Sequence, residues 1–205
     1  MSDQKFEKPN SKTDIHNNRT EHRGRIWFVI FIVLTILWLV IIFYMSAQPA
    51  TESSNISSGI GSWLARLFSP DYQSWPPAEW NAHVDFIEHL IRKAAHFTEY
   101  SILGILLCVD LFLSTVINKK GIELSGEQTI TFGKPNWKRI LLYAWIIGTA
   151  YSATDEFHQL FVEGRSGELL DVMIDSSGVF IGSLVAVLVG SLTERRKNKT
   201  IKPVQ

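Results

Sequence analysis

Long apolar runs separated by polar segments set the pattern of this chain. Each run has about 20 residues, enough for a helix to cross a hydrocarbon core of ~30 Å, and the runs cover residues 26–45, 94–117, 139–161 and 172–192. The pattern predicts an all-α fold, an integral membrane four-helix bundle. The flanking residues 1–25 and 193–205 are polar, and we predict a disordered cytoplasmic tail and a basic cytoplasmic tail there.

The first apolar run is interpreted as an uncleaved anchor. It is longer than the apolar region of about 7–15 residues in a signal peptide, and Pro49 makes the segment behind it a poor cleavage site. Apolar residues then recur every three or four positions at Ile60, Trp63, Leu64, Leu67 and Phe68. This spacing predicts a short helix at about residues 57–69 that lies along the membrane surface; the alternative is a helix packed on the protein itself.

The distribution of charge predicts the orientation. The chain carries 20 Lys and Arg and 20 Asp and Glu, and its neutral balance gives no support for nucleic-acid binding. Basic residues gather in the two tails and in the polar segment 118–138, so the positive-inside rule predicts a plasma-membrane protein with both termini cytoplasmic. The single cysteine, Cys108, excludes an internal disulfide and a Cys-based zinc site.

Ionisable residues stand at the edges of three of the apolar runs. In the predicted orientation they all lie within about 10 Å of the outer membrane boundary. The second membrane helix, starting near Asp85, carries Arg92, Lys93, His96 and Glu99; the third carries Asp155, Glu156 and Gln159; the fourth carries Asp171 and Asp175; and Arg165 lies in the turn between the last two. Because charged faces are unfavourable in lipid, we expect these faces to converge on one interior or on a cavity open to the outside.

The acids of this set outnumber the bases, so protonation, solvation, a cationic ligand or a metal must balance them. The catalytic candidates are His96, Glu99, Asp155, Glu156 and Asp175, and the ligand-binding candidates are Arg92, Lys93, Gln159, Arg165 and Asp171. Hard oxygen ligands would favour a divalent cation such as Mg²⁺, Mn²⁺ or Ca²⁺ over zinc. The alternative is a polar network that only holds the fold, with Asp171 capping its helix and His158 lying off the shared face.

Several motifs in these stretches resemble the VanZ family of bacterial membrane proteins. The motifs are Arg92 to Tyr100, Asp155 to Gln159, Gly164 to Gly167 and Asp171 to Gly178, together with Ser46-Ala47-Gln48-Pro49 after the first helix. The resemblance covers about residues 44–182 and leaves out both tails and the insert at 118–138. It implies an integral protein of the cell envelope, often from Gram-positive bacteria, and the family's namesake is linked to low-level resistance to teicoplanin. It implies no reaction.

Three functions are compatible with these observations. The first is an envelope factor with an outward-facing polar site, whose partners are membrane lipid and a lipid-linked cell-wall precursor or a lipoglycopeptide antibiotic. The second is a membrane-embedded hydrolase or transferase acting on a lipid-linked phosphate, with His96 or Glu156 as base and Arg92 and Arg165 on the phosphate. The third, an ion-coupled transporter, is less favoured, because polar residues at one end leave no relay across the membrane.

Overall fold

The computed structural model describes residues 11–122 and 135–200, and these residues form helices joined by short connections. The helices are α1 (Ser11–Ser46), α2 (Ala50–Phe68), α3 (Pro77–Ile122), α4 (Trp137–Gln159) and α5 (Leu169–Thr200), with a 3₁₀ turn at Tyr72–Ser74. No strand occurs within the described ranges. The all-helical prediction is therefore confirmed.

Three helices contain segments long and apolar enough to cross a membrane. These segments are His22–Ser46, Pro77–Ile117 and Leu169–Arg196. The helix predicted as the third crossing exists as α4, which has 23 residues, but it falls short of the other three in apolar character. A membrane protein with three candidate spans is what the helices establish, and the fourth crossing stays a prediction.

Several helices extend beyond the apolar runs that predicted them. α1 begins at Ser11, inside the stretch predicted as a disordered tail, and Met1 to Asn10 lie outside the described residues. A helix fixed by its apolar part gains one backbone hydrogen bond per added residue, so it propagates into polar sequence. Prolines set two other boundaries: Pro49 stands directly before α2, and Pro77 is the first residue of α3, a position that suits its fixed φ.

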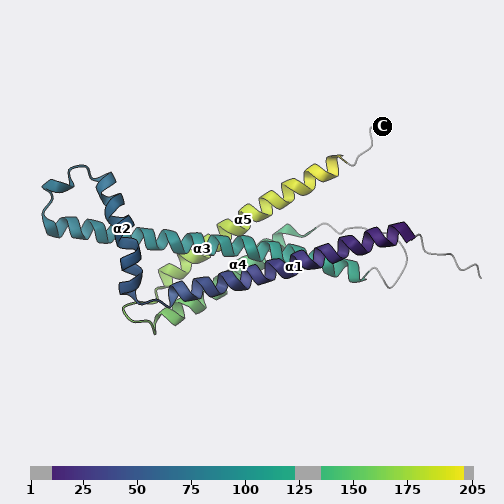
Figure 1. Cartoon of the computed structure of the whole chain (residues 1–205), viewed down its shortest axis with the longest axis horizontal. Coiled ribbons are helices and arrows are strands. Elements are labelled where there is room, and N and C mark those ends of the chain that lie inside the picture. The colour runs from purple at the N-terminus through teal and green to yellow at the C-terminus, as the bar shows by residue number, and fades with distance from the viewer. Residues whose placement is uncertain (1–10, 123–134, 201–205) are drawn as a thin grey trace, which may run out of the picture.

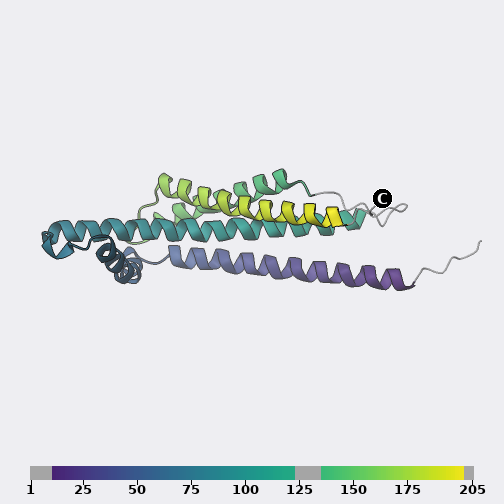
Figure 2. The same ribbon diagram turned by 90° about the horizontal axis from the view of Figure 1, so that it is seen from above.

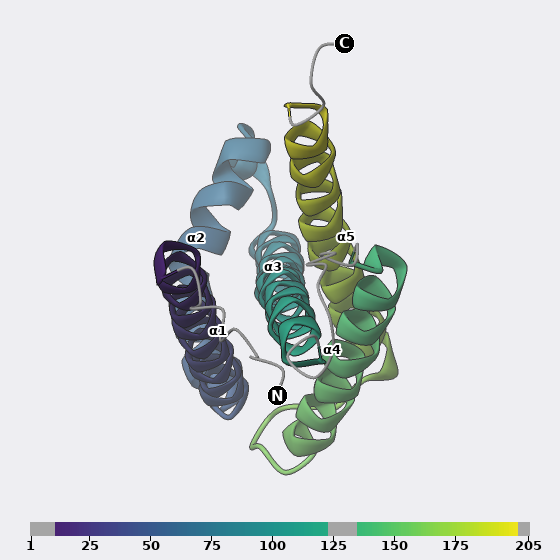
Figure 3. The same ribbon diagram turned by 90° about the vertical axis from the view of Figure 1, so that its right-hand side faces the viewer.

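α3 lies at the centre of the molecule. Seen along the long axis, α1 lies on one side of α3, and α4 and α5 lie on the other (Figure 3). The four long helices run lengthwise through the molecule, with α5 inclined to α3 (Figure 1). The described start of α1 and end of α5 lie at the same end of the molecule (Figure 2). α2 crosses this axis near the opposite end and packs on the first part of α3 (Figure 1).

Glycines allow α3 and α5 to pack closely. A Cβ atom on Gly178 would lie 2.5 Å from the backbone oxygen of Phe97, and one on Gly182 would overlap the backbone oxygen of Ser101. On the α3 side, Gly104 faces Val179 and Ser183, and the Ser183 hydroxyl donates to the Gly104 carbonyl at 3.2 Å. Small residues at helix contacts let backbones approach in a membrane, as expected for Gly178 and Gly182.

Two small apolar clusters form the core beside this contact. Ile42, Tyr100, Leu103 and Val179 pack together in one, and Cys108, Ile140 and Ala144 pack together in the other. Large apolar side chains on the outer faces of α1, α4 and α5 are exposed, for example Val40 at 58% and Val189 at 60%. This distribution suits helices that face hydrocarbon rather than water.

Candidate polar site at one end of the helices

The ionisable residues predicted to converge lie together at the end of the molecule next to α2. We call the following set the polar cluster: Ser46 of α1; Arg92, Lys93, His96, Glu99 and Tyr100 of α3; Ser152, Asp155, Glu156 and Gln159 of α4; Arg165 of the α4–α5 connection; and Asp171 and Asp175 of α5. The contacts below join all four long helices. The spacing that places these residues on shared helical faces therefore also places them at one level.

Two buried carboxyl groups form the centre of the cluster. The Tyr100 hydroxyl donates to Oδ2 of Asp155 at 3.2 Å, which links α3 to α4. The Ser152 hydroxyl donates to Oδ2 of Asp175 at 3.1 Å, which links α4 to α5. Asp155 is 3% exposed and Asp175 is fully buried, so both carboxyl groups are withdrawn from solvent and lipid.

Glu156 and Gln159 tie the cluster to its surroundings. The Gln159 amide donates to the Ser46 hydroxyl at 2.9 Å and to Oε1 of Glu156 at 3.1 Å. Oε2 of Glu156 accepts from the backbone N–H of Glu168, directly before α5, at 3.1 Å. Both oxygens of Glu156 are thus occupied. Glu156 fixes the start of α5, and Gln159 fixes the end of α1.

Arg165 holds the connection between α4 and α5 against the end of α1. Its guanidinium donates to the carbonyl oxygen of Gln48 at 2.9 Å and to that of Met45 at 3.3 Å. Partial burial lowers the pKa of Arg165 and the nearby charge of Arg92 lowers it further, while the opposite effect comes from Asp155, Glu156 and Glu99. Arginine nevertheless stays protonated at physiological pH, so a positive charge remains beside the acids.

Ion pairing accounts for little of the acidic charge. Lys93 forms a salt bridge with Asp171. Among the described residues, no salt bridge reaches Glu99, Asp155, Glu156 or Asp175. Glu99 and His96 are partly exposed, so the cluster reaches the surface through them.

Three buried polar atoms of the cluster have no hydrogen-bond partner in the described part of the chain. They are Nδ1 of His96, Oδ1 of Asp155 and Oδ1 of Asp175. Nearly all buried polar atoms in proteins are hydrogen-bonded, and exceptions call for a ligand, water or a strained functional arrangement. The cluster therefore has unused hydrogen-bonding capacity in its interior.

The acids are too dispersed for a simple metal site. Within residues 11–122 and 135–200, no three His, Cys, Asp or Glu residues form a group that could hold a metal ion. The cluster instead has the arrangement of a hydrogen-bonding site: two buried carboxyl groups, an imidazole near the surface and flanking cations.

The sequence comparisons identify the family of the chain. A family model described as VanZ/LLP1 matches residues 31–190. The chain belongs to the VanZ/LLP1 family. The match begins inside α1 and ends inside α5, so every residue of the polar cluster lies within it, and the VanZ resemblance is confirmed. No curated protein and no solved structure matches the chain.

Two residues of this VanZ/LLP1 member that hydrogen-bond to Asp155 and to Gln159 were not among the predicted site residues. Tyr100 and Ser46 lie in the motifs that carried the resemblance, but neither is charged at ordinary pH, so the pattern of charges along the chain does not indicate them. Tyr100 follows Glu99 and stands four residues after His96, and this spacing indicates that Tyr100 lies on the same helical face as His96. Of the other histidines, His158 stacks its ring on Phe43 with centroids 4.6 Å apart, and its Nε2 is buried without a hydrogen-bond partner in the described part of the chain.

A buried acid deeper in the membrane domain was also not among the predicted site residues. Asp110 stands alone within the apolar run of α3 and is 6% exposed. Its Oδ2 accepts from the Thr35 hydroxyl of α1 at 2.6 Å, and its Oδ1 has no partner among the described residues. Its place in the sequence was a usable indication, because a single acid within an apolar run raises the free energy of membrane insertion and usually marks a functional or packing contact.

The Asp110 bond belongs to a face of α1 that contacts α3 and α4. Thr35, Trp38, Leu39, Ile42 and Ser46 follow each other at helical spacing on this face. The Trp38 indole donates to the Glu99 carbonyl at 2.9 Å, and Leu39 accepts from the Tyr151 hydroxyl at 2.7 Å. The first helix is therefore part of the site's framework as well as an anchor.

Proposed function

We propose that this VanZ/LLP1 member is a plasma-membrane protein of the cell envelope, with both termini cytoplasmic. Its polar cluster binds a lipid-anchored molecule at the outer leaflet, a lipid-linked cell-wall precursor or a lipoglycopeptide, and the protein thereby confers low-level resistance to teicoplanin-type antibiotics. The observation that carries the proposal is the pair of buried carboxyl groups, Asp155 and Asp175, each with an unpartnered oxygen.

The charge of the cluster supports a ligand rich in hydrogen-bond donors. Asp155 and Asp175 offer acceptor oxygens, and the acids of the cluster outnumber Arg92, Lys93 and Arg165. Hydroxyl and ammonium groups would complete these acceptors and balance the charge. Glycan precursors and glycopeptides both carry such groups on a molecule anchored in the same leaflet.

The position of α2 supports access from the membrane surface. Its exposed face is apolar, with Ile60 at 53%, Trp63 at 62% and Leu67 at 58%, and its other face packs on α3 at Gly61. The helix crosses the bundle axis beside the polar cluster (Figure 1). We infer that α2 lies in the headgroup region, where Trp is favoured, and that α4 completes a four-helix membrane bundle.

Susceptibility measurements test the resistance proposal. A deletion strain should become more sensitive to teicoplanin than to vancomycin, and overexpression should have the opposite effect. Complementation with Asp155→Asn or Asp175→Asn should fail, whereas Asp85→Asn, at an exposed position of α3, should restore resistance. Unchanged susceptibility to both antibiotics after deletion and overexpression contradicts the proposal.

A second candidate is a membrane-embedded hydrolase or transferase that acts on a lipid-linked phosphate. It is favoured by Nδ1 of His96, an unpartnered imidazole atom near the cation of Arg165 and the carboxylate of Asp171. His96 or Glu156 would act as base, although both oxygens of Glu156 already accept hydrogen bonds. Lipid profiling of His96→Gln, Glu99→Gln and Asp175→Asn strains tests this candidate, and wild-type lipid composition in all three rules it out.

A further inference from the structure

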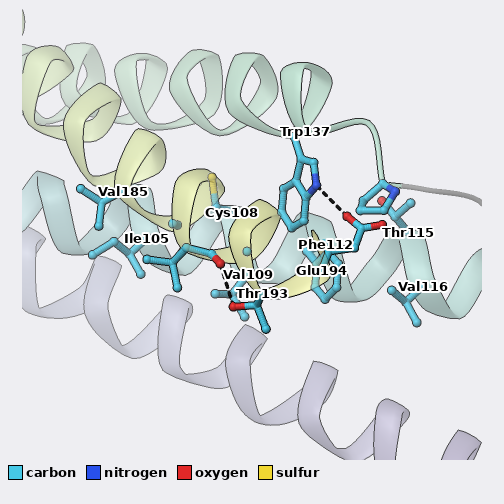
Figure 4. A pocket seen from close by; sticks show the side chains of 14 residues that line it. Ile105, Cys108, Val109, Phe112, Thr115, Val116, Trp137, Val185, Thr193 and Glu194 are labelled. Atoms are coloured by element: carbon cyan, nitrogen blue, oxygen red, sulfur yellow. Dashed lines mark hydrogen bonds between the residues drawn. The ribbon is translucent and has the colours of Figure 1, made fainter. Parts of the chain in front are cut away.

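An apolar cavity lies at the end of the helices opposite the polar cluster. It has a volume of about 610 Å³, within the ~300–1,000 Å³ typical of ligand pockets. Its walls come from the second half of α3, the start of α4 and the second half of α5 (Figure 4). Neither the resistance proposal nor the enzyme alternative uses it.

The lining changes character along the cavity. Toward the middle of the helices it consists of Ile105, Cys108, Val109, Val185 and Ala186, and toward their ends of Thr115, Pro135, Trp137, Thr193 and Glu194. The apolar part lies within the candidate spans of α3 and α5. The Trp137 indole donates to Glu194 at 3.0 Å and stacks on Phe112, which closes part of the polar rim (Figure 4).

The cavity is open to the surroundings of the membrane helices. Val185 and Val189 line it and are 48% and 60% exposed. In a bilayer, an opening at this depth is continuous with hydrocarbon. A soluble polar ligand would gain nothing from such walls, whereas an acyl chain would.

Basic residues adjoin two residues of the polar rim in the sequence. Lys138 and Arg139 directly follow Trp137, Arg195 directly follows Glu194, and all three side chains are exposed. The one acid of the rim, Glu194, accepts from Trp137. Lys and Arg at the end of a membrane helix attract anionic headgroups, especially on the cytoplasmic side predicted for this end.

We propose that the cavity binds an anionic phospholipid of the inner leaflet. One acyl chain occupies the space between α3 and α5, and Lys138, Arg139 and Arg195 hold the phosphate. The apolar depth of the cavity, and the exposed basic residues that adjoin Trp137 and Glu194 in the sequence, match the two parts of this ligand. The inference rests on membrane insertion and on the cytoplasmic position of this end, and it is independent of the polar cluster.

Native mass spectrometry of the purified full-length protein tests the proposal, with phosphatidylglycerol and phosphatidylcholine of identical acyl chains as probes. The wild type should bind one phosphatidylglycerol about tenfold more tightly than phosphatidylcholine. Val189→Trp fills the cavity and should weaken phosphatidylglycerol binding about tenfold. Its matched control is Val29→Trp, on an exposed face of α1 (58%), which should bind as the wild type does.

A second variant tests the rim and does not depend on filling the cavity. Lys138→Gln with Arg139→Gln should remove most of the preference for phosphatidylglycerol and leave phosphatidylcholine binding unchanged. Arg23→Gln with Arg25→Gln removes the same charge from exposed positions of α1 near the same predicted membrane face and should have no effect. Equal wild-type affinity for the two lipids, or equal losses in a variant and its matched control, overturns the proposal.

Discussion

Replacing Tyr100 by Phe removes one hydroxyl group from the interior and leaves the volume of the ring in place. The Tyr100 side chain is fully buried, and its hydroxyl donates to Asp155, which is 3% exposed. The other carboxyl oxygen of Asp155 already lacks a partner among the described residues. The substitution therefore removes a donor from a carboxyl group that water cannot reach.

The expected cost follows from the environment and the geometry. Leaving a buried polar group unsatisfied costs about 1–3 kcal/mol in soluble proteins, whereas side-chain hydrogen bonds in a membrane protein average about 0.6 and reach about 1.7 kcal/mol. The distance of 3.2 Å is long for an O–H···O bond, which argues for the lower part of this range. We expect a loss of about 1 kcal/mol, or about fivefold in the unfolding equilibrium.

Unfolding by sodium dodecyl sulfate in mixed micelles, followed by circular dichroism, measures this loss. Tyr44→Phe is the control, because Tyr44 is 65% exposed. A double-mutant cycle of Tyr100→Phe with Asp155→Asn isolates the coupling between the two side chains, which should exceed about 0.5 kcal/mol. A coupling near zero, or an equal loss in Tyr44→Phe, refutes the view that this bond holds α3 to α4.

The remaining predictions concern other contacts between elements. Gly182→Ala should lower the free energy of unfolding by about 1–3 kcal/mol in the same titration, because the added methyl group forces α3 and α5 apart. The control Gly59→Ala has open space around the added methyl group and should be neutral or stabilising. Equal effects of the two substitutions contradict the close packing. Thr35→Val removes the hydroxyl that bonds Asp110 and should lower the free energy of unfolding by about 0.6–1.7 kcal/mol. The loss should be smaller for Thr98→Val, because the Thr98 hydroxyl bonds a carbonyl of its own helix. The reverse order contradicts a bond between α1 and α3. Arg165→Lys keeps the positive charge but loses the planar guanidinium that donates to two carbonyl oxygens. Limited proteolysis should therefore cut the α4–α5 connection faster than in the wild type. An unchanged rate contradicts the view that Arg165 holds this connection against α1.

The helices and the level of the site could be read from the sequence because both depend on local pattern. An apolar run of about 20 residues predicts a membrane helix wherever it occurs, and α1, α3 and α5 follow such runs. Helical periodicity placed His96 with Glu99, and Asp171 with Asp175, on shared faces. Both pairs belong to the polar cluster at one end of the long helices.

The limits of the helices were harder to predict. α1 and α2 both begin earlier than their apolar patterns, at Ser11 and Ala50. A helix needs apolar residues to bind to its neighbours, but not to continue once formed, so its ends depend on prolines, caps and neighbouring elements. The apolar character of α4 was also overestimated, because its charged and amide residues lie at both ends of the run.

Hydrogen-bond partners were decided only by the tertiary structure. Residue type and periodicity say that Asp155, Asp175 and Asp110 are costly in a membrane, but not that Tyr100, Ser152 and Thr35 are the donors they meet. Those donors come from other helices, and their choice depends on how closely α3 approaches α1, α4 and α5. The sequence by itself determined the helices, their faces and the family. Close packing at Gly178 and Gly182 decided which faces meet, because contacts across 4 Å depend on the relative placement of whole helices and not on local pattern.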